Sequence, residues 1–409
     1  MGFEQALSGL QAASAALDNI GNNIANSQTV GFKDATTQFA DVYASTLYGS
    51  AANQIGIGVD VAAVTSQFTQ GNITTTGNPL DLAINGQGFF QVQSNGVTSY
   101  TRDGEFSLNS TGNIVNSAGQ ELLGYPAAAN GTISTGVAQP LVLSSAATAP
   151  QATTTASLSL NLDSSDTPIT VAFNANNSDT YNSSTSMTVY DSLGNPHTLT
   201  TYYVMSAANT WNVYASVDGN VLNAGNPIPP GLTFNDNGLL ASGASANMSL
   251  TIPVTTGATS PMTMSLQFPY TSTTQYGSAF APSANTQNGY SAGQLASFSV
   301  GANGIITGQY TNGETYQLGQ VALANFTNPQ GLTATSGNLY QQSQASGQPI
   351  VGAPGAGSLG VLQSGAVENS TVDITSQLVA MITAQQAYQA NAETVKTQDQ
   401  VDQTLMTLR

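Results

Sequence analysis

One short motif in the sequence is of the kind that positions a catalytic serine. Residues 289–293 read Gly-Tyr-Ser-Ala-Gly and match the G-x-S-x-G nucleophile elbow of hydrolases. That fold places its histidine base after the serine, but His197, the only histidine, precedes Ser291. No helical pattern follows the motif, although the elbow is a strand-to-helix turn. A flexible turn therefore explains this segment better than a hydrolase site.

Metal and cofactor chemistry have equally little support. The chain has no cysteine and a single histidine, so it cannot build a thiolate or a multi-histidine zinc site. Residues 235–240 (NDNGLL) resemble the start of a calcium loop but lack its remaining ligands, and Gly56-Ile57-Gly58 lacks the third glycine of a dinucleotide motif. We expect no metal, no cofactor and no enzymatic activity. The sequence leaves one enzyme class open, because the two carboxylates of a glycosidase can come from anywhere in the chain.

Charge is scarce and one-sided. The 409 residues include 21 acidic and 4 basic residues, so the net charge is −17 and charged residues make up only 6% of the chain. Binding to nucleic acid or to anionic lipid relies on clusters of Lys and Arg, which this composition does not provide. The 40% hydrophobic content is enough for a folded core, whose surface must then be mostly Ser, Thr, Asn, Gln and Gly.

No segment has the pattern of a secretory signal or a membrane span. The first 23 residues lack both a basic region and an unbroken apolar stretch. No run of about 18 apolar residues is present, so we expect no membrane insertion. The absence of cysteine is compatible with an extracellular location.

An amphipathic helix is predicted at the start of the chain. Apolar residues recur every seven positions, with others three residues further on, as at the a and d positions of a coiled coil. These seam residues are Phe3, Leu10, Leu17 and Ile24, with Ala6, Ala13 and Ile20 between them. Gly31, followed by Phe32, is a typical signal for the end of this helix.

A second amphipathic helix is predicted at the end of the chain, with Ser370 or Thr371 as its cap. Its seam residues are Ile374, Leu378, Met381, Tyr388, Ala392 and Val395, followed after a break near Gln398 by Val401, Leu405 and Leu408. The simplest arrangement buries the two seams against each other. Periodicity alone is compatible both with an ordinary helical subdomain and with a part built for assembly.

Uncharged amides occupy the other faces of both predicted helices. In the first helix they are Asn19, Asn22, Asn23 and Asn26, and in the second they include Gln386 and Asn391. Amides donate and accept hydrogen bonds without repelling an identical neighbour, so such faces suit contacts between copies of one chain. A general avoidance of charge explains the same pattern.

Between the helices the sequence predicts antiparallel β-structure, with alternating apolar residues and two-residue turns such as Asp218-Gly219. Low-complexity stretches at 144–157 and 278–293 indicate domain boundaries. We therefore expect a mainly β fold with paired terminal helices and two nested antiparallel β domains. The predicted parts are a helical core domain (1–33 and 359–409), a connector (34–70), an inner β domain (71–147 and 285–358) and an inserted outer β domain (148–284).

Several segments resemble the axial proteins of bacterial flagella. Residues 19–33 (NIGNNIANSQTVGFK), which include Gly31, Phe32 and Lys33, are similar to a signature shared by rod, hook and hook-filament junction proteins. Five further segments resemble the flagellar hook proteins in particular: 77–92, 100–126, 190–197, 319–332 and 391–400. Distal rod proteins share the two ends and the inner β domain, but they are shorter and lack an insertion at 150–284.

The resemblance implies a structural subunit that polymerises with copies of itself into a curved, flexible tube, the universal joint between motor and filament. It implies an extracellular location in the flagellum and export by the flagellar type III apparatus without a cleaved signal peptide. The implied partners are the hook cap, distal rod and hook-filament junction proteins. The terminal helices would form the inner wall of the tube, and the β domains its middle and outer layers.

One residue departs from the pattern of that family, and two other functions stay open. Gln386 stands where the family often has an arginine, which puts a charged contact at this position in doubt. An extracellular adhesin or glycan-binding β protein would have a similar composition, as would a β-rich carbohydrate-active enzyme. Neither class requires heptad repeats at both ends of the chain.

Overall fold

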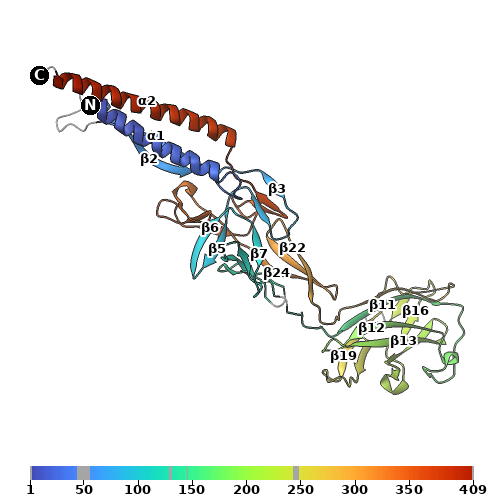
Figure 1. Ribbon diagram of the computed structural model, residues 1–409. Coiled ribbons are helices and arrows are strands. Elements are labelled where there is room, and N and C mark those ends of the chain that lie inside the picture. The colour runs from blue at the N-terminus through green and yellow to red at the C-terminus, as the bar shows by residue number, and fades with distance from the viewer. Residues whose placement is uncertain (1, 44–55, 129–130, 145, 243–247, 408–409) are drawn as a thin grey trace. The chain divides into compact units, whose positions relative to one another are not determined.

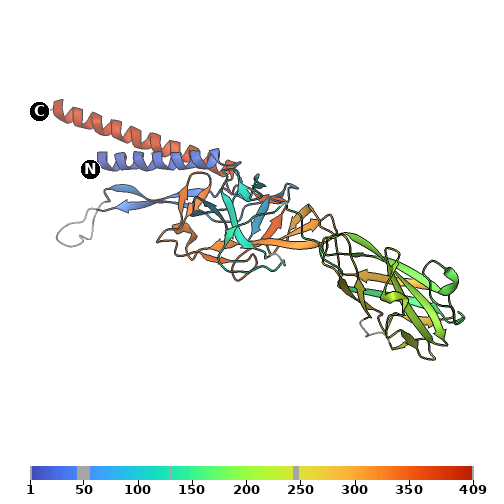
Figure 2. The ribbon, with the colours of Figure 1, turned by 90° about the horizontal axis from the view of Figure 1, so that it is seen from below.

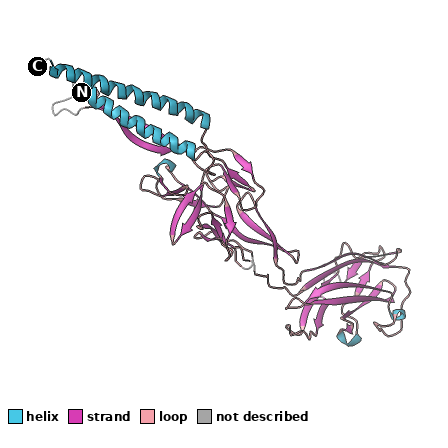
Figure 3. Cartoon of the chain, viewed as in Figure 1, coloured by secondary structure: helices cyan, strands magenta, loops and turns pink. Residues whose placement is uncertain are grey.

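The computed structural model describes residues 2–43, 56–128, 131–144, 146–242 and 248–407. The chain divides into two compact units: the first contains residues 1–145, 297–309 and 315–409, and the second contains 146–296 and 310–314. Helices lie near the two ends of the chain, and strands dominate the sequence between them (Figure 3). The predicted fold class, mainly β with terminal helices, is confirmed.

The two long helices pair within the first unit. Helix α1 spans Gly2–Ala25 and helix α2 spans Ile374–Thr407, and they lie alongside each other in both views (Figures 1 and 2). Gly9 lies beside Asn391 and Asn23 lies beside Gln377, so the two helices run antiparallel. The pairing of the terminal helices, predicted from their heptad patterns, is confirmed.

The first helix is shorter than predicted. It ends at Ala25, and beyond it the N–H of Ser27 donates to Ile24 O (3.2 Å) and that of Thr29 to Asn26 O (3.1 Å), which are the bonds of tight turns. The side-chain amide of Asn26 also donates to the carbonyl of Asn22 (2.9 Å). Asparagine side chains that compete for backbone groups favour helix ends and turns. Gly31 has a left-handed φ of 69°, but it lies in the turns beyond the helix and does not terminate it.

The second helix also begins later than the predicted domain boundary at residue 359. Residues 359–373 contain strands β29 (Val361–Ser364) and β30 (Ala366–Glu368), which pair with strands from the early part of the chain. The helix cap is Asp373, whose Oδ1 accepts the backbone N–H of Thr375 at 2.9 Å. Ser370 and Thr371 do not cap the helix, since it begins only at Ile374.

The predicted connector, 34–70, contains an antiparallel hairpin. Strand β1 (Ala35–Val42) pairs with strand β2 (Gly58–Ser66), with a bulge between Gln38 and Phe39. The hairpin packs along α1. Gln5 donates to Gly56 O (2.5 Å), and Ser8 Oγ accepts the N–H of Val59 (3.2 Å). The weak sequence pattern of this segment did not predict the hairpin.

The remaining strands of the first unit include a large, mostly antiparallel sheet and two small two-stranded sheets, β29–β4 and β3–β30. The strands are β3 (Ile73–Thr75), β4 (Leu82–Asn85), β5 (Phe89–Ser94), β6 (Val97–Thr101), β7 (Phe106–Leu108), β8 (Ile114–Asn116), β9 (Glu121–Pro126), β10 (Gln139–Pro140), β22 (Leu295–Val300), β23 (Ile305–Tyr310), β24 (Thr315–Val321), β25 (Leu323–Asn325), β26 (Thr333–Thr335), β27 (Leu339–Gln341) and β28 (Ile350–Gly352), with a 3₁₀ turn at Pro329–Gly331. The central path of the large sheet runs β22-β23-β24-β9-β5-β6-β27-β26. Its core includes Ile84, Phe90, Leu122 and Leu323, all nearly inaccessible to solvent.

The second unit has two sheets around one apolar core. Its strands are β11 (Thr155–Asp163), β12 (Ser183–Tyr190), β13 (Pro196–Ala207), β14 (Thr210–Val217), β15 (Asn220–Val221), β16 (Leu232–Phe234), β17 (Leu240–Ser242), β18 (Met248–Ile252), β19 (Met262–Gln267), β20 (Thr274–Tyr276) and β21 (Ala281–Gln287), with 3₁₀ turns at Ser178–Thr180 and Asn223–Gly225. The alternating residues Leu158, Leu160 and Leu162 lie in the same core as Trp211. Asp218 and Gly219 both have positive φ, as a type I′ turn requires.

The pairing in the second unit is not wholly antiparallel. Strand β11 runs parallel to β19 and to β20, while β21 pairs with it in the antiparallel sense. Parallel neighbours need a long crossover connection, and here strands β12 to β18 lie in the chain between β11 and β19. Short-range turn signals could not reveal these two pairings.

Candidate assembly site at the terminal helices

Small side chains form the contact between α1 and α2. Of the predicted seam on α1, Ala6, Ala13 and Ile20 are buried. At Gly9 the helices approach so closely that a Cβ atom would lie 2.7 Å from Nδ2 of Asn391. Small residues at a helix contact allow the short interaxial distance that such a contact needs.

The sequence contains a signal for this contact that large-residue periodicity misses. On α2 the residues Gln377, Ala380, Ala384, Ala387 and Asn391 are spaced alternately by three and four positions, which is also heptad spacing. Four of the five border the same groove as the small residues of α1. Ala380 and Ala387 are nevertheless exposed, whereas the less exposed positions of α2 include Gln377, Met381, Ala384, Asn391 and Val395. The stripe toward α1 therefore mixes small residues, amides and two of the predicted seam residues.

Several large seam residues are not buried by the helix pair. Phe3 remains 41% exposed on α1, and Ile374, Leu378, Tyr388 and Val401 remain 42%, 42%, 43% and 51% exposed on α2. The prediction that these five side chains pack between the two helices is therefore wrong. Leu10, Leu17, Ile24, Met381 and Val395 are half-buried, and Leu408 lies outside the described residues. Leu405 belongs to α2.

Two of the predicted intersubunit amides instead bind the hairpin of their own chain. Asn19 and Asn23 both donate through Nδ2 to the carbonyl of Ala35 at 2.8 Å, and Asn23 Oδ1 accepts the N–H of Ala35 at 3.0 Å. Asn23 is 1% exposed. A role for Asn23 in contacts between copies is therefore excluded, since its amide is buried and satisfied within the chain.

Three asparagines border an open cleft of about 740 Å³ beside the end of α1. Asn19, Asn22 and Asn26 line it, together with residues 334–340 of the hairpin formed by β26 and β27. Asn26 Nδ2 also donates to Asn22 Oδ1 at 2.6 Å. On α2, Gln386 is exposed, and Asn391 is half-buried beside Gly9. These amides, unlike Asn23, remain accessible.

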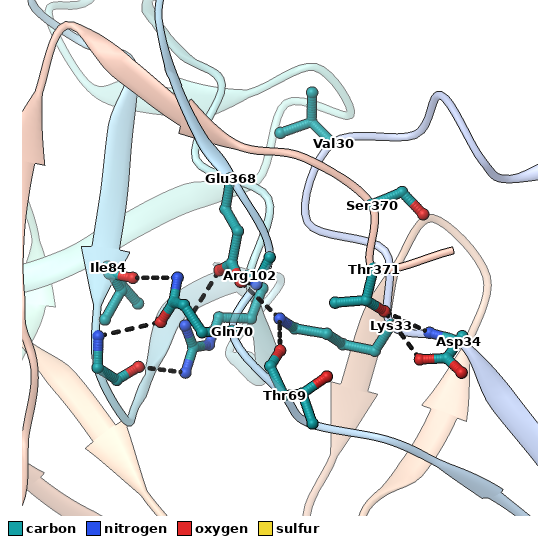
Figure 4. A network of polar contacts seen from close by, with 12 residues as sticks. Val30, Lys33, Asp34, Thr69, Gln70, Ile84, Arg102, Glu368, Ser370 and Thr371 are labelled. Carbon is teal, nitrogen blue, oxygen red and sulfur yellow. Dashed lines mark hydrogen bonds and ion pairs between the residues drawn. The ribbon is translucent and has the colours of Figure 1, made fainter. Parts of the chain in front are cut away.

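A buried ionic network holds the segments that follow α1 and precede α2 (Figure 4). Lys33 Nζ donates to Glu368 Oε1 at 2.6 Å and to the carbonyl of Thr69 at 2.5 Å. Arg102 Nη1 donates to Glu368 Oε2 at 3.1 Å, and its Nη2 donates to the carbonyl of Gly86 at 2.7 Å. Glu368 thus binds two of the four basic residues in the chain.

Burying the charged groups of this network away from water costs free energy. Lys33 and Glu368 are each 1% exposed and Arg102 is 5% exposed. Burial lowers the pKa of Lys33 below its ordinary value, and the adjacent Glu368 carboxylate opposes that shift. Burial lowers the pKa of Arg102 as well, again opposed by Glu368. Two cations share one carboxylate, so Glu368 is the group whose loss would leave both unpaired.

Further hydrogen bonds tie the first residues after α1 to the last residues before α2. Thr371 Oγ1 accepts the N–H of Asp34 and donates to Asp34 Oδ1, both at 2.9 Å (Figure 4). The backbone N–H of Thr371 donates to the carbonyl of Phe32 at 3.1 Å. The helices are thus anchored at one end by side chains and backbone from both halves of the chain.

Gly31 is required where the segment that follows α1 meets the segment that precedes α2. Its N–H donates to the carbonyl of Glu368 at 2.7 Å, and its φ is 69°. A Cβ atom at this position would lie 2.4 Å from the carbonyl carbon of Arg102. Only glycine fits both the left-handed backbone and this close approach.

The candidate hydrolase residues do not form a catalytic arrangement. His197 Nδ1 lies 2.6 Å from Asp218 Oδ2 and its Nε2 lies 3.3 Å from Asp191 Oδ2, so both ring nitrogens face carboxylates of the second unit. The next element that the structure describes after Ser291 is strand β22, so the strand-to-helix turn of a nucleophile elbow does not form there. In the part of the chain that the structure describes, no cluster of three His, Cys, Asp or Glu side chains is suited to a metal ion. Within the same residues, neither helix is apolar enough over its length to cross a membrane.

Four protein-family models match successive parts of the chain. Residues 3–33 match "Flagella basal body rod protein" and residues 83–165 match "Flagellar hook protein FlgE/F/G D1 domain". Residues 161–290 match "Flagellar basal body protein FlaE D2 domain" and residues 363–408 match "Flagellar basal body rod FlgEFG protein C-terminal". The matched regions include α1, α2 and much of both units.

Curated relatives are similar over the full chain. The flagellar hook protein FlgE of Escherichia coli (strain K12) is 44% identical over 420 aligned residues, with all of both chains covered. The FlgE of Salmonella typhimurium is 43% identical with the same coverage, and that of Treponema pallidum is 31% identical over 98% of each chain. The crystal structure of Helicobacter pylori flagellar hook protein FlgE2 aligns with a TM-score of 0.53 at 14% identity, covering 72% of this chain and 100% of that one. At that identity, the structural match shows a shared fold.

Proposed function

The chain belongs to the flagellar hook protein family, and on that premise we propose that it polymerises with copies of itself through its terminal helices into a curved, flexible tube. This tube is the universal joint that passes motor torque to the filament. The second unit, and with it the predicted domain 148–284, would form the outer layer. The match of residues 161–290 to a FlaE D2 domain favours a hook subunit over a distal rod subunit, for which we expect no such insertion.

The observation that carries this proposal is the apolar surface left exposed by the helix pair. Large apolar residues along α2 stay more than two-fifths exposed although α1 lies against the same helix. Three of them, Ile374, Leu378 and Ile382, are four positions apart and so lie on one side of the helix, and an exposed apolar cluster of this kind on a folded protein marks an interaction site. Burying it against further copies would stabilise a polymer by about 25 cal/mol for each Å² removed from water.

The scarcity of charge suits a joint that bends as it turns. Each row of subunits must lengthen and shorten during a revolution, so some contacts have to slide. Fixed ion pairs would favour particular registers, whereas hydrogen bonds between amides, hydroxyls and water exchange at little net cost. With charged residues at only 6% of the chain, contacts between the β parts of neighbouring copies would be mostly of the second kind.

The same premise extends to partners and location. We propose that the hook cap, the distal rod and the hook-filament junction proteins contact the polymer. We also propose that the chain leaves the cell through the flagellar type III apparatus without a cleaved signal peptide and works outside the cell. A structural role without catalysis agrees with the names of the relatives and with the engaged ring of His197.

Polymerisation of seam variants tests the proposal. Leu10→Asp or Leu17→Asp introduces a charge at a half-buried position of the helix layer, so we expect loss of tubes in electron micrographs and a monomer in sedimentation. Val171→Asp, at a 64% exposed apolar residue of the second unit, is the matched control and should polymerise normally. Normal tubes from the Leu17→Asp variant would contradict assembly through the helices.

A further inference from the structure

A groove lined by small residues runs beside the helix pair. Its volume is about 550 Å³, and all of its walls belong to the first unit. The walls come from α1 (Gly9, Ala12, Ala13, Ala16 and Ile20), from α2 (Ala380, Thr383, Ala384, Ala387 and Asn391) and from the hairpin (Phe39 and Val59). The groove is apolar and free of charged side chains, so it suits an apolar occupant.

A ridge of large apolar residues lies on the same helix. Ile374, Leu378 and Ile382 are spaced by four positions, so they form one stripe along α2. They are 42%, 42% and 53% exposed, and burial would remove this apolar surface from water.

The ridge and the groove lie on opposite flanks of α2. At about 100° per residue, the centre of Ile374, Leu378 and Ile382 lies about 170° around the helix from the centre of Ala380, Thr383 and Ala387. One copy therefore cannot place its own ridge in its own groove. A second copy can.

We propose that the ridge Ile374, Leu378 and Ile382 of one copy docks into the small-residue groove of the next copy. This inference rests on the proposed function, because it identifies the surfaces through which copies of the chain polymerise. Large side chains facing a wall of Ala and Gly pack by shape, as ridges of one helix pack into grooves of another.

The distribution of charge favours a copy of the same chain as the occupant. The whole chain carries a net charge of −17, so copies repel each other over most of their surface. Residues 374–392 of α2 contain no charged side chain, and they include the ridge and the α2 wall of the groove. This stretch is therefore a place where two copies can approach without unpaired charges.

The geometry also explains why the product would be open-ended. A contact between two different surfaces on opposite flanks is heterologous, and such contacts generate rings or open helical polymers instead of closed dimers. Each added copy presents a new free groove or ridge. The helix pair thus contains both halves of a repeating contact.

Cysteine cross-linking tests the contact, since the chain has no cysteine of its own. One chain carries Ile382→Cys and a second, tagged chain carries Ala380→Cys, and the two are polymerised together in concentrated sulfate and oxidised. Sulfate strengthens apolar burial and so promotes assembly. We expect the mixed disulfide dimer to exceed that of a control pair by about tenfold, because a disulfide needs Cα atoms within about 7 Å. The control pair replaces Ile382→Cys with Thr397→Cys, an exposed α2 position that belongs neither to the row of the ridge nor to the walls of the groove.

The outcomes separate this inference from the proposed function. Tubes in which the control pair cross-links as strongly as the test pair would overturn the docking of ridge into groove while leaving polymerisation intact. Absence of tubes from the unmodified chain would overturn both. As a second measurement, Ala380→Trp should fill the groove and abolish tubes, whereas Thr397→Trp should not. Tubes from Ala380→Trp would also overturn the docking.

Discussion

Glu368 is the residue that holds together the segment after α1 and the segment before α2. Its carboxylate binds Lys33 and Arg102 in a dry environment and also accepts the N–H of Gly71 at 2.6 Å. Lys33 belongs to the segment that resembles the axial signature, and the structure gives that lysine an internal role. Sequence periodicity could not predict this network, because its members are far apart in the chain and each contributes a single residue.

Glu368→Gln should destabilise the first unit. The variant leaves two buried cations without a counter-charge, so we expect the free energy of unfolding to fall by about 3–5 kcal/mol. Calorimetry of the full chain would show a lower transition for the first unit, while Trp211 fluorescence, which reports the second unit, stays unchanged. Glu393→Gln is the matched control: its pair with Lys396 is 3.2 Å long and well exposed, and its loss should cost less than about 1 kcal/mol. Equal effects of the two variants would show that the buried network adds no stability.

His197 should make the stability of the second unit depend on pH. Burial opposes its protonation, but hydrogen bonds to Asp218 and Asp191 raise the pKa of His197 above its ordinary value. A raised folded-state pKa adds stability that is complete below about pH 6.5 and is lost as the pH rises through the folded-state value. Urea unfolding followed by Trp211 fluorescence should therefore show stability falling from pH 6 towards pH 9. His197→Gln should remove that slope; an unchanged slope in the variant would contradict the assignment.

At the scale of elements, the heptad patterns predicted the existence and the pairing of the terminal helices, but not which stripe makes the contact. Ile374 and Leu378 have the same spacing as Gln377 and Met381, but only the second pair is half-buried, so spacing cannot tell a stripe that packs within the chain from one left exposed. On α1 the small residues Gly9 and Ala13 mark the contact, because close helix approach selects Ala and Gly. The amide at Asn23 was ambiguous for a similar reason: its partner, Ala35, lies in a hairpin that the weak pattern of residues 34–70 did not predict.

Overfilling the helix contact should weaken it. Ala13→Leu adds three carbon atoms at an 8% exposed position facing α2, so we expect a loss of about 1–3 kcal/mol in stability of the helix pair. The loss of helical circular dichroism on heating would then begin at a lower temperature. Ser14→Leu, at the neighbouring exposed position, is the control and should not lower it. A similar shift from both variants would argue against a tight small-residue contact at Ala13.

At the scale of the whole molecule, the amino-acid composition limits the kinds of contact that copies can make. A net charge of −17 and a near absence of cations leave apolar burial and uncharged hydrogen bonds as the available attractions. Composition therefore excluded nucleic acid and anionic lipid as partners. The resemblance of several segments predicted the flagellar hook protein family, to which the curated relatives belong. The parallel pairing of β11 could not be predicted this way, because it depends on strands more than a hundred residues apart.

Salt should accelerate polymerisation. Copies of like net charge repel over the Debye length, which shortens from about 30 Å at 0.01 M to about 8 Å at 0.15 M ionic strength. Light scattering of the purified chain should show faster growth of polymers at the higher ionic strength, with sulfate more effective than chloride. Growth that slows with added salt would instead indicate that ion pairs between copies drive assembly.

The most direct test of assembly through the terminal helices is an electron cryomicroscopy reconstruction of tubes formed by the full chain. We expect α1 and α2 at the smallest radius, in contact with the helices of neighbouring copies, and the second unit farther from the axis. Tubes with the second unit innermost, or with the helices of neighbouring copies out of contact, would contradict it.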